Sequence, residues 1–304
     1  MARHVVVVGG GNAALCAAIS ARECGADVTL LERAPFELRG GNSRFTAGGM
    51  RAVYGGVDDL VSLMPDLTPD EIQRTDFSSY SSGEFFDDMG RITQYRCDPE
   101  LVDRLVNLSF PTLRWMRTHG VRFLPMYGRQ SFNVEGRVKF WGGLTIEAWG
   151  GGPGLVDSLT KAAQRLGVQL RYGVRAIALT MRSGRAAGVR VRTASGEESI
   201  DADAVVLAAG GFEANPAWRA RYLGPGWDLA RVRGTRFNTG DGIAMALDAG
   251  AASRGNWSGC HAVAWDANAP EFGDLDVGDG FQKHSYPLGI MVNTRGERFV
   301  DEGA

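Results

Sequence analysis

Cysteine is scarce in this chain, which has four cysteines among its 304 residues. Cys16, Cys24, Cys97 and Cys260 show no Cys-x-x-Cys spacing, which excludes the usual zinc and redox motifs. Their wide separation also argues against the disulfide framework of a small secreted domain. We therefore expect reduced thiols, no bound metal and a cytoplasmic location.

Long apolar runs and a strong charge of one sign are missing as well. Arg3 and His4 precede only four valines before the first glycine, which does not fit a secretory signal peptide. No apolar run approaches the length of a membrane span, so we expect membrane association at most through a partner protein. The formal net charge of −2 excludes the basic footprint of a nucleic-acid-binding protein.

Glycine, by contrast, is abundant, and its most informative cluster lies near the N-terminus. The four valines 5–8 lead directly into three glycines, 9–11. A segment of small residues follows, and a second apolar segment ends at Glu32. A strand, a glycine turn, a helix and a second strand that ends in an acid are the fingerprint of a dinucleotide-binding βαβ unit.

Each part of this fingerprint has a mechanical reason. Gly9 permits the tight turn out of the strand, Gly11 lets the backbone approach a pyrophosphate, and Ala14 keeps the helix close to the sheet. The amides and the dipole at the start of the helix attract phosphates. Glu32 can accept hydrogen bonds from both hydroxyls of an adenosine ribose, which favours FAD or NAD over NADP.

The rest of the chain predicts a mixed α/β organisation. Asp98 and Pro99 are typical of a helix start, and Pro111 should kink or split the helix that follows. A second, amphipathic helix is expected over 155–166, and a final strand over 289–293. A β-meander is expected over four segments: 169–172, 176–181, 186–193 and 204–208.

Three further segments look suited to a flat cofactor. Residues 40–49 combine four glycines with Asn, Ser and Thr, and they follow the Glu32 strand closely. Residues 205–212 predict a buried parallel strand that ends in small residues. In the segment 239–242, Asp241 is either an N-terminal helix cap or an acceptor for a ribityl hydroxyl.

Together these residues resemble the FAD-dependent fumarate reductase/succinate dehydrogenase flavoprotein family, over residues 5–302. The resemblance implies an α/β fold: a Rossmann-like FAD-binding domain of the GR2 type, with a parallel sheet and a β-meander, and the start of an inserted α+β capping domain. Residues 1–255 would form the FAD domain, without its C-terminal return segment, and residues 256–304 would begin a truncated substrate-capping domain. Apolar surface that the return segment would cover should then be exposed.

The motifs and the resemblance together predict the FAD contacts. Val174 would meet the adenine through its backbone, and Asn42 occupies the position at which membrane-bound members carry the histidine that attaches FAD covalently. We therefore expect non-covalent FAD. The residues expected to bind it are Gly9, Gly11, Asn12, Ala13, Ala14, Glu32, Arg33, Gly41, Asn42, Ser43, Thr46, Ala47, Gly48, Gly49, Val174, Ala209, Gly210 and Asp241.

The resemblance implies less about substrate and catalysis. His261 is expected to bind a substrate carboxylate, with His284 as the runner-up. Gln282 and Ser285 stand near positions where soluble fumarate reductases carry a Glu and an Arg as a proton path. The catalytic arginine of the family would lie beyond Ala304, so we expect the chain as given to lack turnover.

Within the family, segments 40–50, 281–293 and 298–302 most resemble dehydrogenases of tricarballylate. The expected function is oxidation of a small polycarboxylate, tricarballylate to cis-aconitate, by hydride transfer to flavin N5, with an electron-acceptor protein as partner. Reduction of a fumarate-like or urocanate-like enoate is one alternative, and a 3-ketosteroid-type dehydrogenase is another. A non-catalytic flavin-binding module is a further alternative for this chain.

Overall fold

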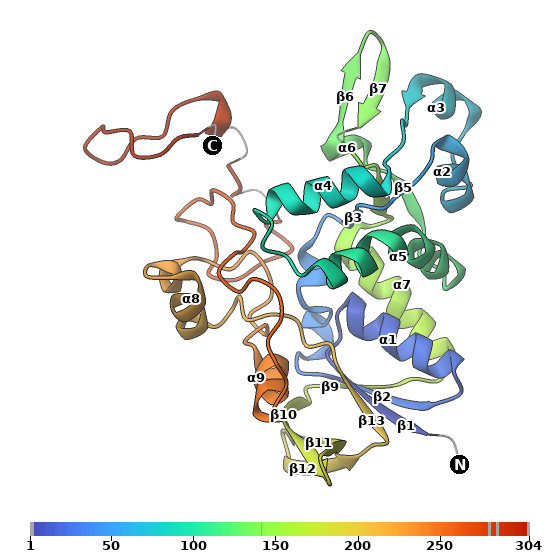
Figure 1. The fold of residues 1–304 in the computed structure, drawn as a ribbon, viewed down its shortest axis with the longest axis vertical. Coiled ribbons are helices and arrows are strands. Elements are labelled where there is room, and N and C mark those ends of the chain that lie inside the picture. The colour runs from blue at the N-terminus through green and yellow to red at the C-terminus, as the bar shows by residue number, and fades with distance from the viewer. Residues whose placement is uncertain (1–2, 141, 279–280, 284–285, 303–304) are drawn as a thin grey trace.

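The computed structural model describes residues 3–140, 142–278, 281–283 and 286–302, and Figure 1 shows their arrangement. The expected βαβ unit is present as β1 (His4–Val8), α1 (Asn12–Glu23) and β2 (Asp27–Glu32). These strands pair in parallel with β9 (Gln169–Tyr172) and β13 (Ala204–Leu207). The strand order β13-β1-β2-β9 places β13 at one edge of the sheet.

The alternating side chains of β1 and β2 build two separate cores. Val7 and Leu30 face the cluster that contains α1, whereas Val6 and Leu31 face the opposite cluster. All four side chains are at most 1% exposed. Strands that are buried on both faces explain the run of valines and leucines in the sequence.

Helices cover one face of the sheet and a β-meander covers the other (Figure 1). On the first face, α7 (Gly151–Arg165) packs beside α1, and small residues such as Ala18 and Ala163 are fully buried between the elements. The antiparallel meander on the second face has three strands: β10 (Arg175–Arg182), β11 (Arg185–Thr193) and β12 (Gly196–Asp201).

The strands of the observed meander differ from the predicted ones. The segments 169–172 and 204–208 do not belong to it, because β9 and β13 pair in parallel with β2 and β1. The strand β12 was missed because its residues are almost all polar and exposed, so they carry no apolar alternation. Strand propensity alone does not specify which sheet a segment joins.

The segment between β2 and α7 is largely helical, with two small three-stranded sheets. Capping boxes at Thr68 and Ser81 begin two of the helices, as Ser/Thr-x-x-Glu sequences favour. The elements are η1 (Phe36–Leu38), η2 (Gly41–Phe45), β3 (Gly49–Met50), α2 (Val57–Leu63), α3 (Pro69–Arg74), β4 (Thr75–Asp76), α4 (Ser82–Ile92), α5 (Pro99–Thr118), β5 (Phe123–Pro125), α6 (Tyr127–Gln130), β6 (Ser131–Val134), β7 (Arg137–Phe140) and β8 (Ile146–Ala148).

The helix α5 starts as predicted but is not split. The Asp98 carboxylate accepts hydrogen bonds from the amides of Glu100 and Leu101 at 3.0 and 3.3 Å. Pro111 lies inside one continuous helix, although it removes a backbone donor. Val106 and Leu113, on either side of it, are both buried in the core, and this packing keeps the helix in one piece.

The C-terminal third has less regular structure. Its helices are α8 (Pro216–Leu223), η3 (Trp227–Leu229), α9 (Asp241–Asp248) and η4 (Tyr286–Leu288). The strand predicted over 289–293 does not form within the described residues, where a single bridge joins Val292 to Arg298. The turn between them is confirmed, because Gly296 adopts a φ of 77°. The domain boundary expected near residue 255 stays a prediction.

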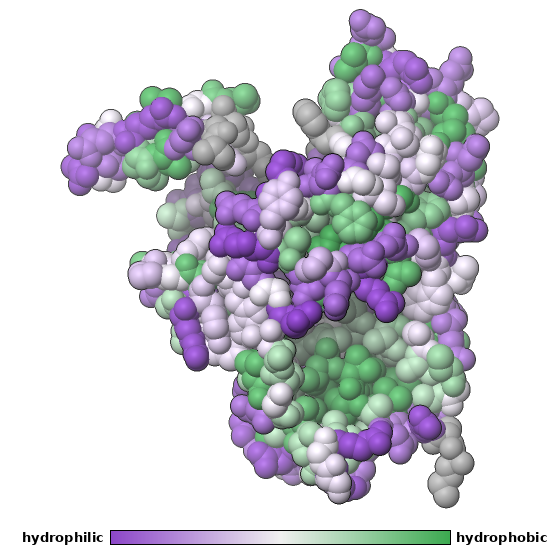
Figure 2. Space-filling view, viewed as in Figure 1, coloured by the Kyte–Doolittle hydropathy of each residue, from purple (hydrophilic) through white to green (hydrophobic). Residues whose placement is uncertain are grey.

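One face of the molecule carries an apolar surface over the edge of the parallel sheet near β13, as Figure 2 shows in green. Ala17 in α1 and Val206 in β13 are partly buried hydrophobic residues that pack against the core of the first face. Among the described helices, none combines the length and the apolar character that a membrane crossing requires. The four cysteines are unpaired, and the described residues hold no cluster of side chains suited to a metal ion.

Candidate cofactor and substrate site

A cavity of about 320 Å³ lies at the carboxyl ends of β1, β2 and β13, where parallel α/β sheets usually bind ligands. Its walls come from the first glycine turn, the segment after β2, the start of β10 and the segments after β13. The predicted cofactor residues that line it are Gly9, Gly11, Asn12, Ala13, Glu32, Arg33, Gly41, Asn42, Ser43, Val174, Ala209, Gly210 and Asp241.

The glycine turn is shaped by close approaches that only glycine allows. Gly9 has a φ of 120°, and a Cβ atom there would lie 2.2 Å from the carbonyl oxygen of Ala208. A Cβ at Gly10 would lie 2.2 Å from Oε2 of Glu32. The turn is therefore pressed against both neighbouring strands, and its backbone forms part of the cavity wall.

The start of α1 is tied to the segment that follows β2. The amide of Asn12 donates to Ser43 Oγ at 3.0 Å, and the hydroxyl of Ser43 donates to Oδ1 of Asn12 at 2.8 Å. The amide of Ala13 donates to the same Asn12 oxygen at 2.9 Å. These bonds use the donors of Asn12, Ala13 and Ser43, and they fix the start of α1 beside the cavity, where the positive end of the helix dipole suits a diphosphate.

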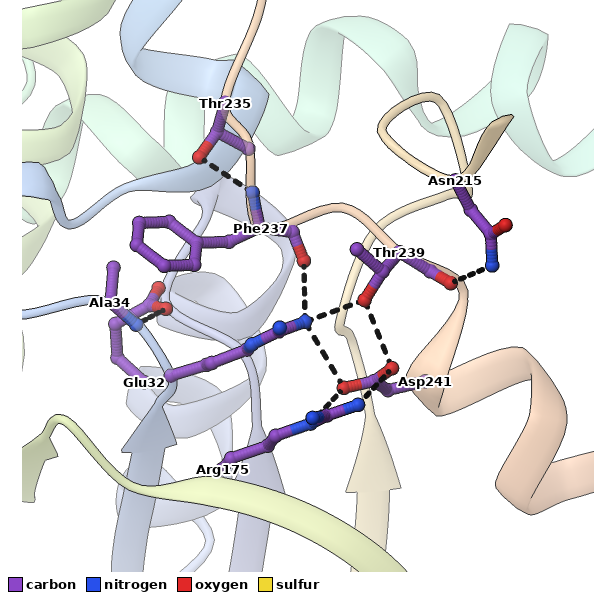
Figure 3. Close-up of polar contacts among 9 residues, drawn as sticks. Glu32, Ala34, Arg175, Asn215, Thr235, Phe237, Thr239 and Asp241 are labelled. Atoms are coloured by element: carbon purple, nitrogen blue, oxygen red, sulfur yellow. Dashed lines mark hydrogen bonds and ion pairs between the residues drawn. The ribbon is translucent and has the colours of Figure 1, made fainter. Parts of the chain in front are cut away.

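Glu32 is the buried acid of the site. Its side chain is almost fully enclosed, and its Oε1 accepts a hydrogen bond from the amide of Ala34 at 2.8 Å (Figure 3). Burial raises the pKa of Glu32, although backbone amides, including that of Ala34, oppose the rise. A buried carboxylate of this kind needs donors, and the two hydroxyls of a ribose would supply them.

A charged network lies beside Glu32 (Figure 3). The Asp241 carboxylate accepts two hydrogen bonds from Arg175, at 2.7 and 3.1 Å, and one from Thr239 at 2.9 Å. Arg33 Nη1 lies 3.2 Å from the same carboxylate. Burial acts to raise the pKa of Asp241, but the hydrogen bonds from Arg175 and Thr239 and the charge of Arg33 outweigh it and lower that pKa.

The structure differs from the prediction for Asp241 and adds Arg175 to the site. Asp241 is not the helix cap, because Gly240, with a φ of 86°, caps α9 and Asp241 is its first helical residue. Arg175 was not predicted, although it lines the cavity directly after Val174. An arginine next to an expected adenine contact was the available signal, but its partner lies 66 residues away in the sequence.

A second cavity, of about 730 Å³, lies further along the segment that follows β2. Three predicted residues of that segment, Thr46, Ala47 and Gly49, line this second cavity. Among the predicted substrate residues, His261 lines it and is exposed, whereas His284 lies outside the described residues. Arg233 and Lys283 also line it and were not predicted.

Two predicted cofactor residues line neither cavity. Ala14 is fully buried in the core beneath the turn. Gly48 packs against backbone, and a Cβ there would lie 2.9 Å from Cα of Gly151. Both support the cavity walls from behind, and their contact with a cofactor stays a prediction.

The first cavity fits the adenosine and diphosphate parts of a dinucleotide. It offers the N-terminus of α1 for phosphates, a buried acid for ribose hydroxyls and a wall that the residues after β9 form. The fold and this site thus define a protein that binds a nucleotide cofactor in the Rossmann manner.

The chain belongs to the FAD binding domain family of the fumarate reductase/succinate dehydrogenase flavoproteins, and the family model matches residues 4–304. FAD is therefore its cofactor. The chain is 28% identical to the probable fumarate reductase Ifc3 of Shewanella frigidimarina (strain NCIMB 400), over 98% of this chain and 46% of that protein. It is 29% identical to the vinyl phenol reductase of Lactiplantibacillus plantarum, over 99% of this chain and 58% of that protein.

A solved structure supports the fold. The open conformation of a flavocytochrome c3 fumarate reductase matches with a TM-score of 0.65 and 29% identity, over 83% of this chain and 41% of that one. The chain spans about half the length of the curated relatives that it matches.

Proposed function

We propose that the full-length protein is an FAD-dependent oxidoreductase that acts on a carbon–carbon bond beside a carboxylate. One observation carries this proposal: a single segment lines both cavities. Gly41, Asn42 and Ser43 contribute to the first cavity, and Thr46 and Gly49 contribute to the second. A dinucleotide that lies along this segment would extend from the first cavity toward the second.

In this proposal the residues of the first cavity bind the cofactor, and those of the second bind the substrate. Glu32 would hold the ribose hydroxyls, and the positive end of the α1 dipole would attract the diphosphate. Arg233 and His261 would hold a substrate carboxylate, since cationic and imidazole donors pair well with carboxylates. Bound FAD supplies a two-electron acceptor for a hydride. In a dehydrogenation a base takes a proton from the neighbouring carbon while the hydride leaves, and a carbon–carbon double bond forms.

Two directions of the reaction are candidates. Dehydrogenation of tricarballylate to cis-aconitate is the reaction that the sequence predicts. The reverse type, reduction of an enoate, is the second candidate, because the two relatives compared above are both named as reductases. A steroid substrate is less well supported, since the described lining of the second cavity includes one aromatic residue, Tyr286, against three basic ones.

Anaerobic reaction of the FAD-loaded full-length protein tests this proposal. Tricarballylate should bleach the visible absorbance of oxidised flavin if the protein is a dehydrogenase. If it is a reductase, cis-aconitate or fumarate should restore that absorbance after reduction with dithionite. A flavin that responds to none of these acids, nor to any aryl-substituted acrylate, would contradict the proposed function.

The partner and the location are proposals of the same kind. In either direction of the reaction the flavin must exchange electrons with a second redox agent, and we propose an electron-transfer protein as that partner. The unpaired cysteines support a cytoplasmic location, which stays a prediction.

A further inference from the structure

Asn238 is a buried polar residue in the wall of the first cavity. It is 7% exposed, and it lines the cavity together with Glu32 and Thr235, which are buried as well. Glu32 accepts a hydrogen bond from the amide of Ala34, and Thr235 Oγ1 accepts one from the amide of Phe237 at 3.3 Å. Among the described residues, by contrast, no donor or acceptor pairs with the side-chain amide of Asn238.

An amide without partners is unfavourable at a buried position. The nitrogen of an asparagine side chain carries two donors, and its oxygen is an acceptor. Leaving such groups unpaired away from water is destabilising, so packing alone would favour an apolar residue at position 238. A ligand in the cavity that pairs with the amide would remove this penalty.

The backbone around Asn238 is held in place by the segments that pack against it. The carbonyl of Asn238 accepts a hydrogen bond from the amide of Ala214 at 2.9 Å. The next carbonyl, that of Thr239, accepts one from Nδ2 of Asn215 at 3.0 Å (Figure 3). The side chain therefore starts from a fixed point in the cavity wall, and little backbone freedom is left to lose when a ligand binds.

Two glycines of the expected cofactor site flank the amide. A Cβ on Gly210 would lie 2.7 Å from Nδ2 of Asn238 and 2.9 Å from its Oδ1. A Cβ on Gly41 would lie 3.9 Å from the same oxygen. The amide of Asn238 is thus placed between the segment that follows β13 and the first residue of η2.

The neighbours of these two glycines pack against the first glycine turn. A Cβ on Gly11 would lie 3.3 Å from Oγ of Ser43, and a Cβ on Gly9 would lie 3.2 Å from Cα of Ala209. The Asn238 amide therefore borders the part of the cavity beside this turn, where the backbone can approach a diphosphate.

We propose that the side-chain amide of Asn238 donates a hydrogen bond to the diphosphate of FAD. The inference concerns the cofactor and does not depend on the substrate proposed above. The hydroxyl of Ser43 already donates to Asn12, and the guanidinium of Arg175 already pairs with Asp241. Asn238 supplies a donor that no other described residue uses, and a hydrogen bond from it to a phosphate is charge-assisted.

Calorimetric titration of the apoprotein with FAD, ADP-ribose and adenosine tests the proposal. ADP-ribose contains the diphosphate diester of FAD, whereas adenosine contains no phosphate. Asn238→Ala should weaken the binding of FAD and ADP-ribose by about 10–100-fold and leave that of adenosine within about twofold. Asn238→Asp keeps the shape of the side chain but replaces its donors by a negative charge, so its loss for FAD and ADP-ribose should exceed that of Asn238→Ala.

A matched control adds the same charge elsewhere. Gln164→Glu, at an exposed position of α7, should bind all three ligands as the unchanged protein does, and circular dichroism verifies that each variant is folded. If Asn238 only shaped the cavity wall, its replacement would weaken ADP-ribose and adenosine by the same factor. That result, or an unchanged FAD affinity in both Asn238 variants, would overturn the proposal.

Discussion

At the scale of single residues, the site depends on a few side chains whose roles follow from local sequence. Glu32 and the glycine turn could be placed from the sequence because both belong to one short contiguous motif with a fixed geometry. Arg175 could not, because its role comes from a contact with Asp241, 66 residues away. Ala14 is fully buried, as expected of a small residue that keeps the helix close to the sheet, whereas its contact with FAD stays a prediction.

The charged carboxylate of Glu32 should lower the free energy of unfolding of the apoprotein. Because burial raises its folded-state pKa, the stability of the apoprotein is greatest below the unfolded pKa and falls as pH rises through the folded one. Glu32→Gln should therefore raise the Tm of the apoprotein at neutral pH by roughly 2 °C, while FAD affinity falls about 10–100-fold. Calorimetry and flavin titration measure the two effects.

The exposed Glu37, five residues away, provides the control for this change. Glu37→Gln should alter neither Tm nor FAD affinity. A Glu32→Gln variant that binds FAD as well as the unchanged protein would remove Glu32 from the ribose site.

Gly10 should be sensitive to a single methyl group. In Gly10→Ala the new Cβ would lie 2.2 Å from Glu32 Oε2, so the carboxylate has to move. We expect a loss of FAD affinity of about tenfold or more with little change in secondary structure by circular dichroism. Gly128→Ala, whose Cβ would meet open space, should bind FAD normally. Equal affinity in both variants would show that the Gly10–Glu32 contact does not shape the site.

At the scale of elements, the sequence indicated α1, α5, α7 and several strands, but not the short elements between β2 and α7 or how the strands pair. The β1-α1-β2 unit and the start of α5 were predictable, because alternation, glycine and capping residues act locally. The segment that became β9 was predicted as a meander strand, yet it joins the parallel sheet. The segment of β13 was predicted both in the meander and as a parallel strand, and the parallel pairing is confirmed. Packing of Val106 and Leu113 likewise kept α5 continuous through Pro111, which local rules predicted to break it.

The N-terminus of α9 is anchored to β10 and to the end of β2 through Asp241. Asp241→Asn would leave Arg33 and Arg175 close together without their shared carboxylate, and we expect a loss of about 1–2 kcal/mol in the free energy of unfolding at neutral pH. Both arginines are partly exposed, which limits the effect. Urea denaturation measures it.

The pH dependence provides a second check on Asp241. Its folded-state pKa is lowered, so its contribution is present above the unfolded value of about 4 and is lost as pH falls through the folded one. The stability difference between the protein and Asp241→Asn should thus shrink in acid. Asp248→Asn, at the exposed C-terminal end of the same helix, is the control: it removes a negative charge that the helix dipole disfavours, so it should not reproduce the loss of stability. If the stability difference between the protein and Asp241→Asn does not change with pH, the ion pairs of Asp241 with Arg33 and Arg175 do not stabilise the fold.

At the scale of the whole molecule, the fold brings two cavities into contact with one segment, η2 and the residues that follow it. The sequence indicated that this segment lies near the cofactor. It did not indicate the second cavity, whose walls come from distant parts of the chain such as α6 and the residues around His261. Long-range packing of this kind has no local sequence signal.

The cofactor should be released without breaking a covalent bond. Asn42 has no nucleophilic ring nitrogen, and its Oδ1 already accepts a hydrogen bond from the amide of Thr235 at 2.9 Å. Acid precipitation of the holoprotein should therefore transfer all yellow colour to the supernatant. Flavin that remains in the pellet would contradict non-covalent binding.

The most direct test of the central claim is calorimetric titration of the apoprotein with FAD and with FMN. The account places the adenosine half in the cavity around Glu32, so FAD should bind at a ratio of about one per chain and at least about 100-fold more tightly than FMN, which lacks that half. FMN binding as tightly as FAD would show that the cavity at the carboxyl edge of the parallel sheet is not the dinucleotide site.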